Sequence, residues 1–187
     1  MTVLYIKNMV CDRCKAAVSQ ALTGLGFTVN VTELGVAEIK EHPDNGQLAE
    51  IRSKLNLLGF ELLEDRQQQT VDRIKSAIIE LVHYHDNKAT SNLSSYLSDK
   101  LNADYSSLSK LFSENTGTTI ERFFILQKVE RVKELLFYNE LSLNEIATKM
   151  NYSSTAYLSS QFKSVTGMTP SQFKAMRKKE LKQLDKI

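Results

Sequence analysis

The second half of this 187-residue sequence repeats itself, and the repeat constrains the fold more than any other feature. Residues 50 positions apart are identical at apolar, threonine and glycine sites. The matched pairs are Leu93 and Leu143, Leu108 and Leu158, Ser109 and Ser159, Phe112 and Phe162, Thr116-Gly117 and Thr166-Gly167, Thr119 and Thr169, and Phe123 and Phe173. Each copy has the pattern of a short helix, a turn, a second helix and a glycine stop, which is typical of a helix-turn-helix. An apolar-periodic stretch over 121–138 predicts a long helix between the copies, so we expect an all-α bihelical domain over residues 71–187.

The first 65 residues have a different pattern, in which strand and helix signals alternate. Period-two alternation and β-branched residues predict strands, and apolar residues at helical spacing predict two helices. The strands are expected at 3–9, 27–34, 36–41 and 60–65, and the helices at 11–26 and 45–59. This βαββαβ order is the ferredoxin-like plan. We therefore predict an α+β domain over residues 1–66, followed by a short polar linker that ends near residue 70.

Charge is distributed unevenly between the two halves. Residues 1–70 hold 7 Lys and Arg against 9 Asp and Glu, whereas residues 71–187 hold 17 against 13. The basic side chains gather near the C-terminus, and the patch consists of Lys174, Arg177, Lys178 and Lys179. An excess of positive charge in the helical half favours a polyanion as its partner.

The composition also indicates where such a chain works. No apolar run approaches the length of a membrane span, and the N-terminus lacks the pattern of a secretory signal. The chain has only 2 cysteines, too few for a disulfide framework, so we expect a reducing, cytoplasmic location. No phosphate loop or Ser-His-Asp arrangement is recognisable, and we do not expect an enzyme.

The stretch LSLNEIATKMNYSSTAYLSSQFKSVTGMTPSQFKAMRK resembles the second helix-turn-helix of AraC/XylS-type transcription regulators. The framework residues are Phe162-Lys163, Gly167, Thr169-Pro170 and Phe173. The resemblance covers about residues 72–180, including a first helix-turn-helix and the linking helix. It implies a DNA-binding transcription regulator whose partner is double-stranded DNA, and it leaves room for a homodimer and for a contact with RNA polymerase.

A helix-turn-helix places its second helix in the major groove. The two recognition helices are expected at about 105–114 and 154–165, and their polar faces are the predicted DNA contacts. These residues are Ser106, Ser109, Lys110, Thr155, Ala156, Ser159, Ser160 and Lys163. Many relatives carry arginine where this chain has Ser160 and Lys128. Because serine discriminates weakly between bases, readout is expected to depend partly on DNA shape.

Both cysteines lie in NMVCDRC, three positions apart, where a strand gives way to a helix. Thiolates at this spacing point toward one ligand, and a helix N-terminus is expected to lower their pKa values. Soft cations are the metals that thiolates select. Two ligands suit Cu(I), whereas Zn(II) would need further ligands from a second chain or molecule.

With the βαββαβ order, Met9, Cys11 and Cys14 resemble the Met-x-Cys-x-x-Cys motif of heavy-metal-associated domains. The resemblance implies that Met9 packs in the core, that Lys15 balances the thiolate charge and that Phe60 lies beside the metal loop. Two alternatives remain open for the cysteines: a metal-handling protein in which DNA binding is secondary, and a thiol sensor of oxidants. The three histidines are weaker candidates as ligands, and they are His42, His83 and His85.

Overall fold

The computed structural model describes residues 1–84 and 92–175. By their contacts the residues form two compact units. One unit consists of Met1–Ala77 with Ser106–Asn115, and the other of Ile78–Tyr105 with Thr116–Ile187.

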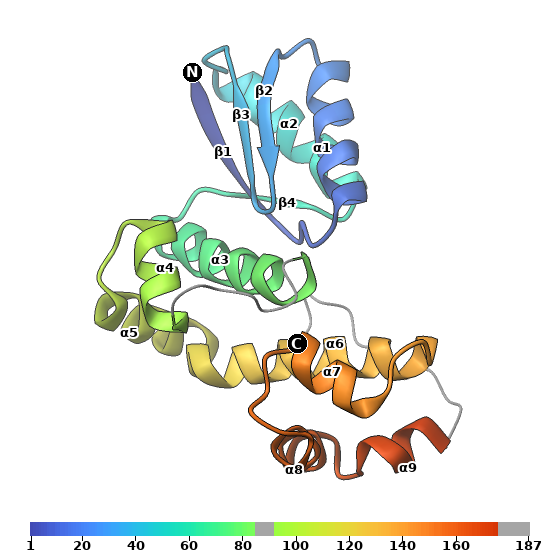
Figure 1. The fold of residues 1–187 in the computed structure, drawn as a ribbon. Coiled ribbons are helices and arrows are strands. Elements are labelled where there is room, and N and C mark those ends of the chain that lie inside the picture. Colours follow the sequence, from blue (N-terminus) through green and yellow to red (C-terminus); the bar gives the residue numbers. More distant parts are fainter. Residues whose placement is uncertain (85–91, 176–187) are drawn as a thin grey trace. The chain divides into compact units, whose positions relative to one another are not determined.

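A four-stranded antiparallel sheet organises the N-terminal part of the chain (Figure 1). The strands are hydrogen-bonded in the order β2-β3-β1-β4, with β1 pairing to both β3 and β4. The predicted βαββαβ order is present. Its elements are β1 (Thr2–Lys7), α1 (Asp12–Gly24), β2 (Val29–Glu33), β3 (Val36–Ile39), α2 (Asn45–Leu57) and β4 (Glu61–Leu63).

One face of this sheet carries the core. Alternation along β1 buries Leu4 and Ile6 while Val3 stays exposed, as the pleat of a strand requires. Helices α1 and α2 contact each other and supply one apolar stripe each, in which Leu22 and Ile51 are fully buried. The core also contains Met9 and Phe60, with Cys14 packed at its edge.

Helix α3 (Arg66–Ile79) begins earlier than the sequence pattern indicates. Residues 66–70 carry no helical signal, yet they form its first turn, because the Asp65 side chain accepts a hydrogen bond from the Gln68 amide at 2.9 Å. The helix continues into a π-helical segment, η1 (Glu80–Tyr84). The expected domain limits at residues 66 and 71 stay predictions.

The remaining elements reproduce the 50-residue repeat. Helices α4 (Leu93–Leu101), α5 (Tyr105–Thr116) and α6 (Ile120–Tyr138) start 50 positions before α7 (Leu143–Lys149), α8 (Thr155–Thr166) and α9 (Pro170–Ala175). Side-chain caps recur at matched positions, because Asn92, Ser142, Thr119 and Thr169 each accept a hydrogen bond from a backbone amide three residues later. The predicted helices, turns and linking helix are therefore confirmed.

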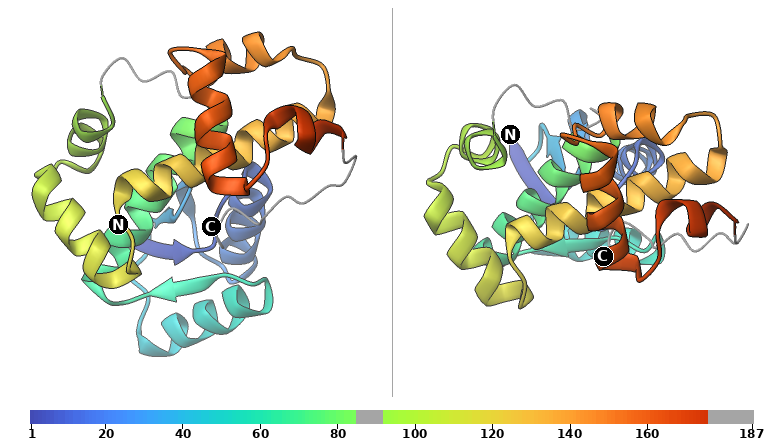
Figure 2. Two further views of the ribbon diagram at one scale, coloured as in Figure 1. Left: turned by 90° about the horizontal axis from the view of Figure 1, so that it is seen from below. Right: turned by 60° about the horizontal axis from the view of Figure 1, so that its bottom comes forward.

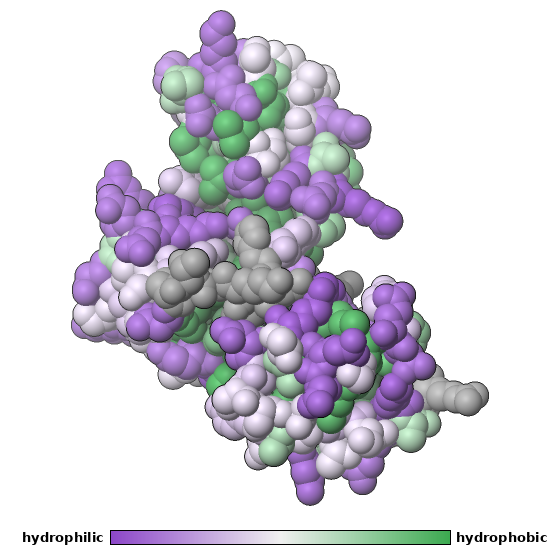
Figure 3. Space-filling view, in the orientation of Figure 1, coloured by the Kyte–Doolittle hydropathy of each residue, from purple (hydrophilic) through white to green (hydrophobic). Residues whose placement is uncertain are grey.

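Hydrophilic side chains cover most of the visible surface, and hydrophobic ones occur in small groups (Figure 3). None of the helices in the described part of the chain is long and apolar enough to cross a membrane.

Gly35 closes the turn between β2 and β3 in a left-handed conformation, with φ +80°. A Cβ atom there would lie 2.8 Å from the Ser76 Oγ of α3. Gly59 has nearly the same backbone conformation, φ +83°, but a Cβ there would have no neighbour within 4 Å. Substitutions at these two glycines therefore distinguish the free-energy cost of backbone strain from the cost of a steric contact with α3.

We predict that Gly35→Ala and Gly59→Ala each lose about 1–2 kcal/mol of unfolding free energy from the left-handed backbone. Gly35→Ala should lose more than Gly59→Ala, because Ser76 must also move, and adding Ser76→Ala should remove this difference. Urea titration followed by circular dichroism measures all three values. Equal losses at the two glycines would show that the approach of α3 to this turn is not tight.

Candidate nucleic-acid interface and thiol pair

The second helix-turn-helix is held by local hydrogen bonds at the start of each helix. Ser142 and Glu145 form a capping box at the start of α7, and the bond to the Ser142 side chain lowers the pKa of Glu145. Asn151 turns the chain with φ 54°. The Ser154 hydroxyl then accepts from the Tyr157 amide at 3.1 Å and caps the start of α8.

Helix α8 buries one face and presents the other. Leu158 and Phe162 are buried, and the Phe162 ring meets the edge of Phe173 with centroids 5.6 Å apart. Contacts with both α6 and α7 hold α8 in place (Figure 2). The predicted DNA-facing residues lie on its outer side: Ala156, Ser160 and Lys163 are exposed, and Thr155 and Ser159 are half-buried.

In the first helix-turn-helix, α4 ends at Asn102, which has φ 51°, and α5 follows after three residues. Ser106 and Lys110 are exposed on α5, and Ser109 is half-buried. The Lys110 ammonium lies 4.0 Å from a carboxylate oxygen of Glu114. An exposed pair of this kind is weak, so Lys110 stays available to a phosphate.

Tyr157 is a surface residue that the sequence prediction missed. It lies in the first turn of α8 and is 54% exposed, which is unusual for a large aromatic side chain. Its ring meets the edge of the Tyr152 ring, with centroids 5.9 Å apart. The sequence could have indicated this surface position, because Tyr157 precedes the predicted DNA contact Ser160 by three positions, and residues three apart share a helix face.

The linking helix α6 buries polar side chains whose burial the spacing of its apolar residues does not predict. Gln127 is fully buried and its side-chain oxygen lies 3.1 Å from the His83 Nε2 atom of η1. Lys128 is 7% exposed, and its ammonium lies 3.8 Å from the centroid of the Tyr152 ring. Burial lowers the pKa of Lys128 to about 8.

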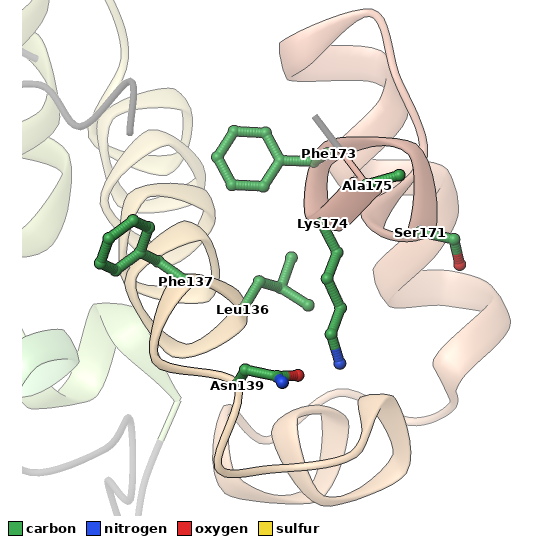
Figure 4. A pocket seen from close by; sticks show the side chains of 7 residues that line it. All are labelled: Leu136, Phe137, Asn139, Ser171, Phe173, Lys174 and Ala175. Carbon is green, nitrogen blue, oxygen red and sulfur yellow. The ribbon is translucent and has the colours of Figure 1, made fainter. Parts of the chain in front are cut away.

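The predicted basic patch is described only at its first member. Lys174 is exposed on α9, at the rim of a pocket of about 750 Å³ between the end of α6 and α9. Its side chain extends toward Asn139, and Leu136 and Phe173 line the apolar side of the pocket (Figure 4). Arg177, Lys178 and Lys179 lie outside the described residues.

The two cysteines are close together at the start of α1. Their Sγ atoms are 3.1 Å apart, both thiols are free and both residues are half-buried. Cys11 precedes α1 in an extended conformation and its side chain makes no cap hydrogen bond, while its carbonyl accepts from the Cys14 amide at 2.9 Å. The backbone at the start of α1 thus brings the two thiols close together.

The pKa of Cys14 does not follow the sequence prediction. Burial at the edge of the core raises its pKa, and a hydrogen bond with Cys11 raises it further, whereas a backbone hydrogen bond at Val10 lowers it. The expectation that the helix N-terminus would lower the pKa is therefore wrong for Cys14. Desolvation of a thiolate outweighs the dipole of the helix here. A metal ion must displace the thiol proton at this position.

The other residues named for this site lie elsewhere or have other partners. Lys15 pairs with Asp12 at 3.2 Å and with Glu33 at 3.4 Å. His42 contacts Thr2 at the far end of β1, and His83 belongs to η1. His85 lies outside the described residues. Met9 is buried in the core as expected.

The thiol pair fits a soft cation only in a low coordination number. Within residues 1–84 and 92–175, no group of three His, Cys, Asp or Glu side chains is arranged to hold a metal. At a metal–sulfur distance of about 2.3 Å, a linear site needs sulfurs about 4.6 Å apart, so the thiols must separate from their present 3.1 Å. Cys11 can supply this movement, because its side chain is not engaged as a cap. The same closeness also suits reversible oxidation to a disulfide.

Comparison with known proteins finds a match within the helical half. Residues 97–176 match the family described as "Helix-turn-helix domain". This match supports the helix-turn-helix part of the resemblance. The match lies within the C-terminal half, and the heavy-metal-associated character of the N-terminal part stays a prediction.

Individual relatives agree with this assignment. The chain is 32% identical over 99 residues to the xylose operon regulatory protein of Escherichia coli (strain K12), covering 52% of this chain and 25% of that protein. An uncharacterized HTH-type transcriptional regulator of Staphylococcus aureus is 30% identical over 116 residues, covering 62% of this chain and 14% of that protein. The chain thus spans a quarter or less of the length of these relatives.

Among solved structures, the chain is similar to the C-terminal domain of AraT, a response regulator from Geobacillus stearothermophilus. The TM-score is 0.51 and the identity 25%, over 63% of this chain and 94% of that one. The fold of the matched part of the chain is therefore similar to that of this C-terminal domain.

We predict that Lys128→Met raises the free energy of unfolding at pH 7 by about 1–2 kcal/mol. The lowered pKa of Lys128, about 8, corresponds to about 3 kcal/mol of destabilisation by the buried charge. Lys128→Met also removes the favourable contact between the ammonium and the Tyr152 ring, which reduces the gain in stability by about 0.5–2 kcal/mol. Lys54→Ala, at an exposed position of α2, is the control for removing one charge.

The sign of the pH dependence follows from the direction of the shift. Because the folded-state pKa of Lys128 lies below the ordinary lysine value, the penalty is complete below pH 8 and disappears as the pH rises toward about 10.4. The advantage of Lys128→Met should therefore shrink between pH 8 and pH 10. Urea titrations at pH 7, 9 and 10 test this, and an advantage that does not change with pH would contradict it.

Proposed function

We propose that this chain is a transcription regulator that binds specific double-stranded DNA through two linked helix-turn-helix units. The observation that carries the proposal is the repeated, capped helix pair, whose second copy presents a polar face on α8 above a buried Leu158 and Phe162. The AraC-type match over 97–176 supports it, and so do relatives that are named as regulators. Because these relatives are much longer than the matched part, the activity of the whole chain is an inference.

The length of the linking helix supports simultaneous use of both copies. Helix α6 has 19 residues and spans about 28 Å. Successive major grooves on one face of DNA are about 34 Å apart. A helix of this length between the two copies is of the right order for two recognition helices to enter adjacent grooves.

The residue types suggest how affinity and specificity are divided. Lys110, Lys163 and Lys174 are exposed cations and would contact phosphates, which gives affinity without base discrimination. Ser106, Ser109, Ser159 and Ser160 would donate to or accept from base edges with little discrimination. We therefore propose that readout depends on few direct contacts together with DNA shape.

We predict that the full chain protects about two helical turns of DNA and that its affinity falls steeply with salt, because phosphate contacts release counterions. Lys163→Ala should weaken binding on all sequences and reduce the salt slope by about 1. Lys54→Ala removes the same charge from the exposed side of α2 and should leave binding unchanged. The measurements are footprinting on a selected site and fluorescence anisotropy over a range of salt. A footprint of one helical turn, or an affinity that does not depend on salt, would refute DNA binding through both helix-turn-helix units at once.

We further propose that the N-terminal unit is an input domain that binds a soft cation, with Cu(I) preferred, through Cys11 and Cys14. The strand order β2-β3-β1-β4, with α1 and α2 on one face, supports a ferredoxin-like, heavy-metal-associated domain. Bound metal would link the strand–helix loop to the start of α1. A metal-handling protein and an oxidant sensor remain the alternative uses of the same thiols.

We predict that the reduced chain binds one Cu(I) ion, and that Cys11→Ser or Cys14→Ser abolishes tight binding, since one thiolate cannot hold a two-coordinate ion. Affinity should rise with pH, because burial raises the pKa of Cys14 and the metal must displace its proton. Competition with a Cu(I) chelator at several pH values measures this, and Zn(II) is titrated in parallel. Full stoichiometry in the Cys11→Ser, Cys14→Ser double variant would place the metal elsewhere.

The remaining parts of the proposal follow from this role. A regulator of this kind would work in the cytoplasm, and it would contact RNA polymerase or pair with a second chain when bound at a promoter. If occupancy of the thiols changes DNA affinity, DNA must change Cu(I) affinity by the same factor. Measuring Cu(I) affinity with and without the selected DNA distinguishes an input domain from a separate metal-handling one.

A further inference from the structure

Lys128 is a buried cation that no anion balances among residues 1–84 and 92–175. It lies in the middle of α6, with its ammonium 3.8 Å from the centroid of the Tyr152 ring and 5.6 Å from that of Phe124. Burial is the one cause of its lowered pKa, and no carboxylate lies within ion-pair distance of it in the described part of the chain. A charge kept without a partner is expensive, so its surroundings indicate its role.

Tyr152 connects this cation to the recognition helix. The residue is buried in the turn between α7 and α8, and its hydroxyl donates to the side-chain oxygen of Gln161 at 2.7 Å. Its ring also meets Tyr157, the exposed aromatic residue in the first turn of α8. Tyr152 thus contacts the Lys128 ammonium on α6 and also two residues of α8, Tyr157 and Gln161.

We propose that Lys128 is a positioning residue of the DNA interface: its ammonium holds the Tyr152 ring and thereby fixes Tyr157 and the first turn of α8 for contact with DNA. This inference rests on the DNA-binding function proposed above. Tyr157 then belongs to the contact surface itself, with a hydroxyl able to reach a phosphate or a base edge and a ring able to contact a thymine methyl group.

The charge, and not only the shape, of Lys128 is needed for this role. A cation is attracted to the face of an aromatic ring, and the attraction grows when water is excluded. A methionine of similar length would fill the space but would not hold the ring by charge. Arginine would keep both the charge and the stacking, and it would stay protonated throughout the range in which lysine loses its proton.

Other titratable groups around α6 do not explain a pH effect at Lys128. The segments that pack against α6 are η1, α7, α8 and α9. Within the described part of these segments, none of the titratable side chains pairs with the Lys128 ammonium. They are Glu80, His83, Tyr84, Glu145, Lys149, Tyr157, Lys163 and Lys174. Tyr152 itself titrates higher, because burial raises its pKa above the ordinary value.

The test compares Lys128→Met and Lys128→Arg in the full chain, with Cys11 and Cys14 replaced by serine so that no thiol titrates in the same range. The probe is a duplex selected from a random pool with the wild-type chain, and a duplex of random sequence serves as the control. At pH 7 we expect Lys128→Met to bind the selected duplex about 2- to 30-fold more weakly, the range of a buried cation–π contact. Binding to the random duplex should change less, because phosphate contacts are kept.

The pH profile identifies the ammonium as the cause. With lysine at position 128, affinity for the selected duplex should fall by up to about tenfold between pH 7 and pH 9, as the ammonium loses its proton. Lys128→Arg should show no such fall, and Lys128→Met should be weak at both pH values. Tyr157→Ala should reproduce the loss at pH 7 and abolish the dependence on pH.

Three results would overturn the inference. These are equal affinity of Lys128→Met and the wild-type residue at pH 7, parallel pH profiles for lysine and arginine, and weak binding by Lys128→Met that is accompanied by reduced stability. The last result would make Lys128 a purely structural residue, since the buried charge predicts a gain in stability. A wild-type chain that binds no duplex at any pH would instead refute the proposed function, and this inference with it.

Discussion

The helical half depends on a backbone constraint that occurs twice, the left-handed glycine that ends each recognition helix. Gly117 and Gly167 have φ values of 70° and 80°, a conformation that L side chains rarely adopt. The threonine before each glycine accepts a hydrogen bond from the amide two residues on, at 3.3 Å in both copies. Because the chain reverses there, the helix that follows can return a phenylalanine to the core, and Phe173 meets Phe162 in this way.

The left-handed glycine constrains the C-terminal end of each recognition helix. Buried polar side chains of the linking helix α6 add a second constraint. Helix α6 buries Gln127, Lys128 and Glu130 among apolar residues, although each polar group adds a desolvation penalty. Their partners are specific: His83 lies beside Gln127, Lys133 pairs with Glu130 at 3.0 Å, and Tyr152 covers Lys128. An apolar helix could slide against its neighbours with little change in contact, whereas a polar group that loses its partner is penalised. The contact of Lys128 with Tyr152 therefore favours one register of α6 against the second helix-turn-helix, and the contact of Gln127 with His83 favours one register against η1, whereas the Glu130–Lys133 pair lies within α6.

Short-range chemistry explains what could be predicted from the sequence. The strands, the helices and the 50-residue offset depend on alternation, caps and glycines, all of which are visible in a window of a few residues. The buried lysine and the high pKa of Cys14 depend on neighbours distant in sequence, and no local pattern reports burial. The first turn of α3 was missed because the Asp65 cap precedes a polar segment with no apolar stripe. Tyr157 was missed for the opposite reason, since an aromatic residue in a helix is more often core than surface.

The thiol loop illustrates how a local site is set by the fold around it. Asn8 adopts φ 72° and donates from its side chain to the Gly59 carbonyl at 3.0 Å, so the loop is anchored where it leaves β1. Cys14 is anchored at the other end, because it is part of α1 and packs against the core. Cys11 lies between these anchors without a side-chain cap. When a ligand draws the sulfurs into a new geometry, Cys11 has no cap hydrogen bond to break. Both thiols must lose their protons to bind a metal, and burial raises the pKa of Cys14 against this step. The two cysteines of one short motif thus differ in how the fold anchors them, because Cys14 belongs to α1 and packs against the core, whereas Cys11 precedes the helix.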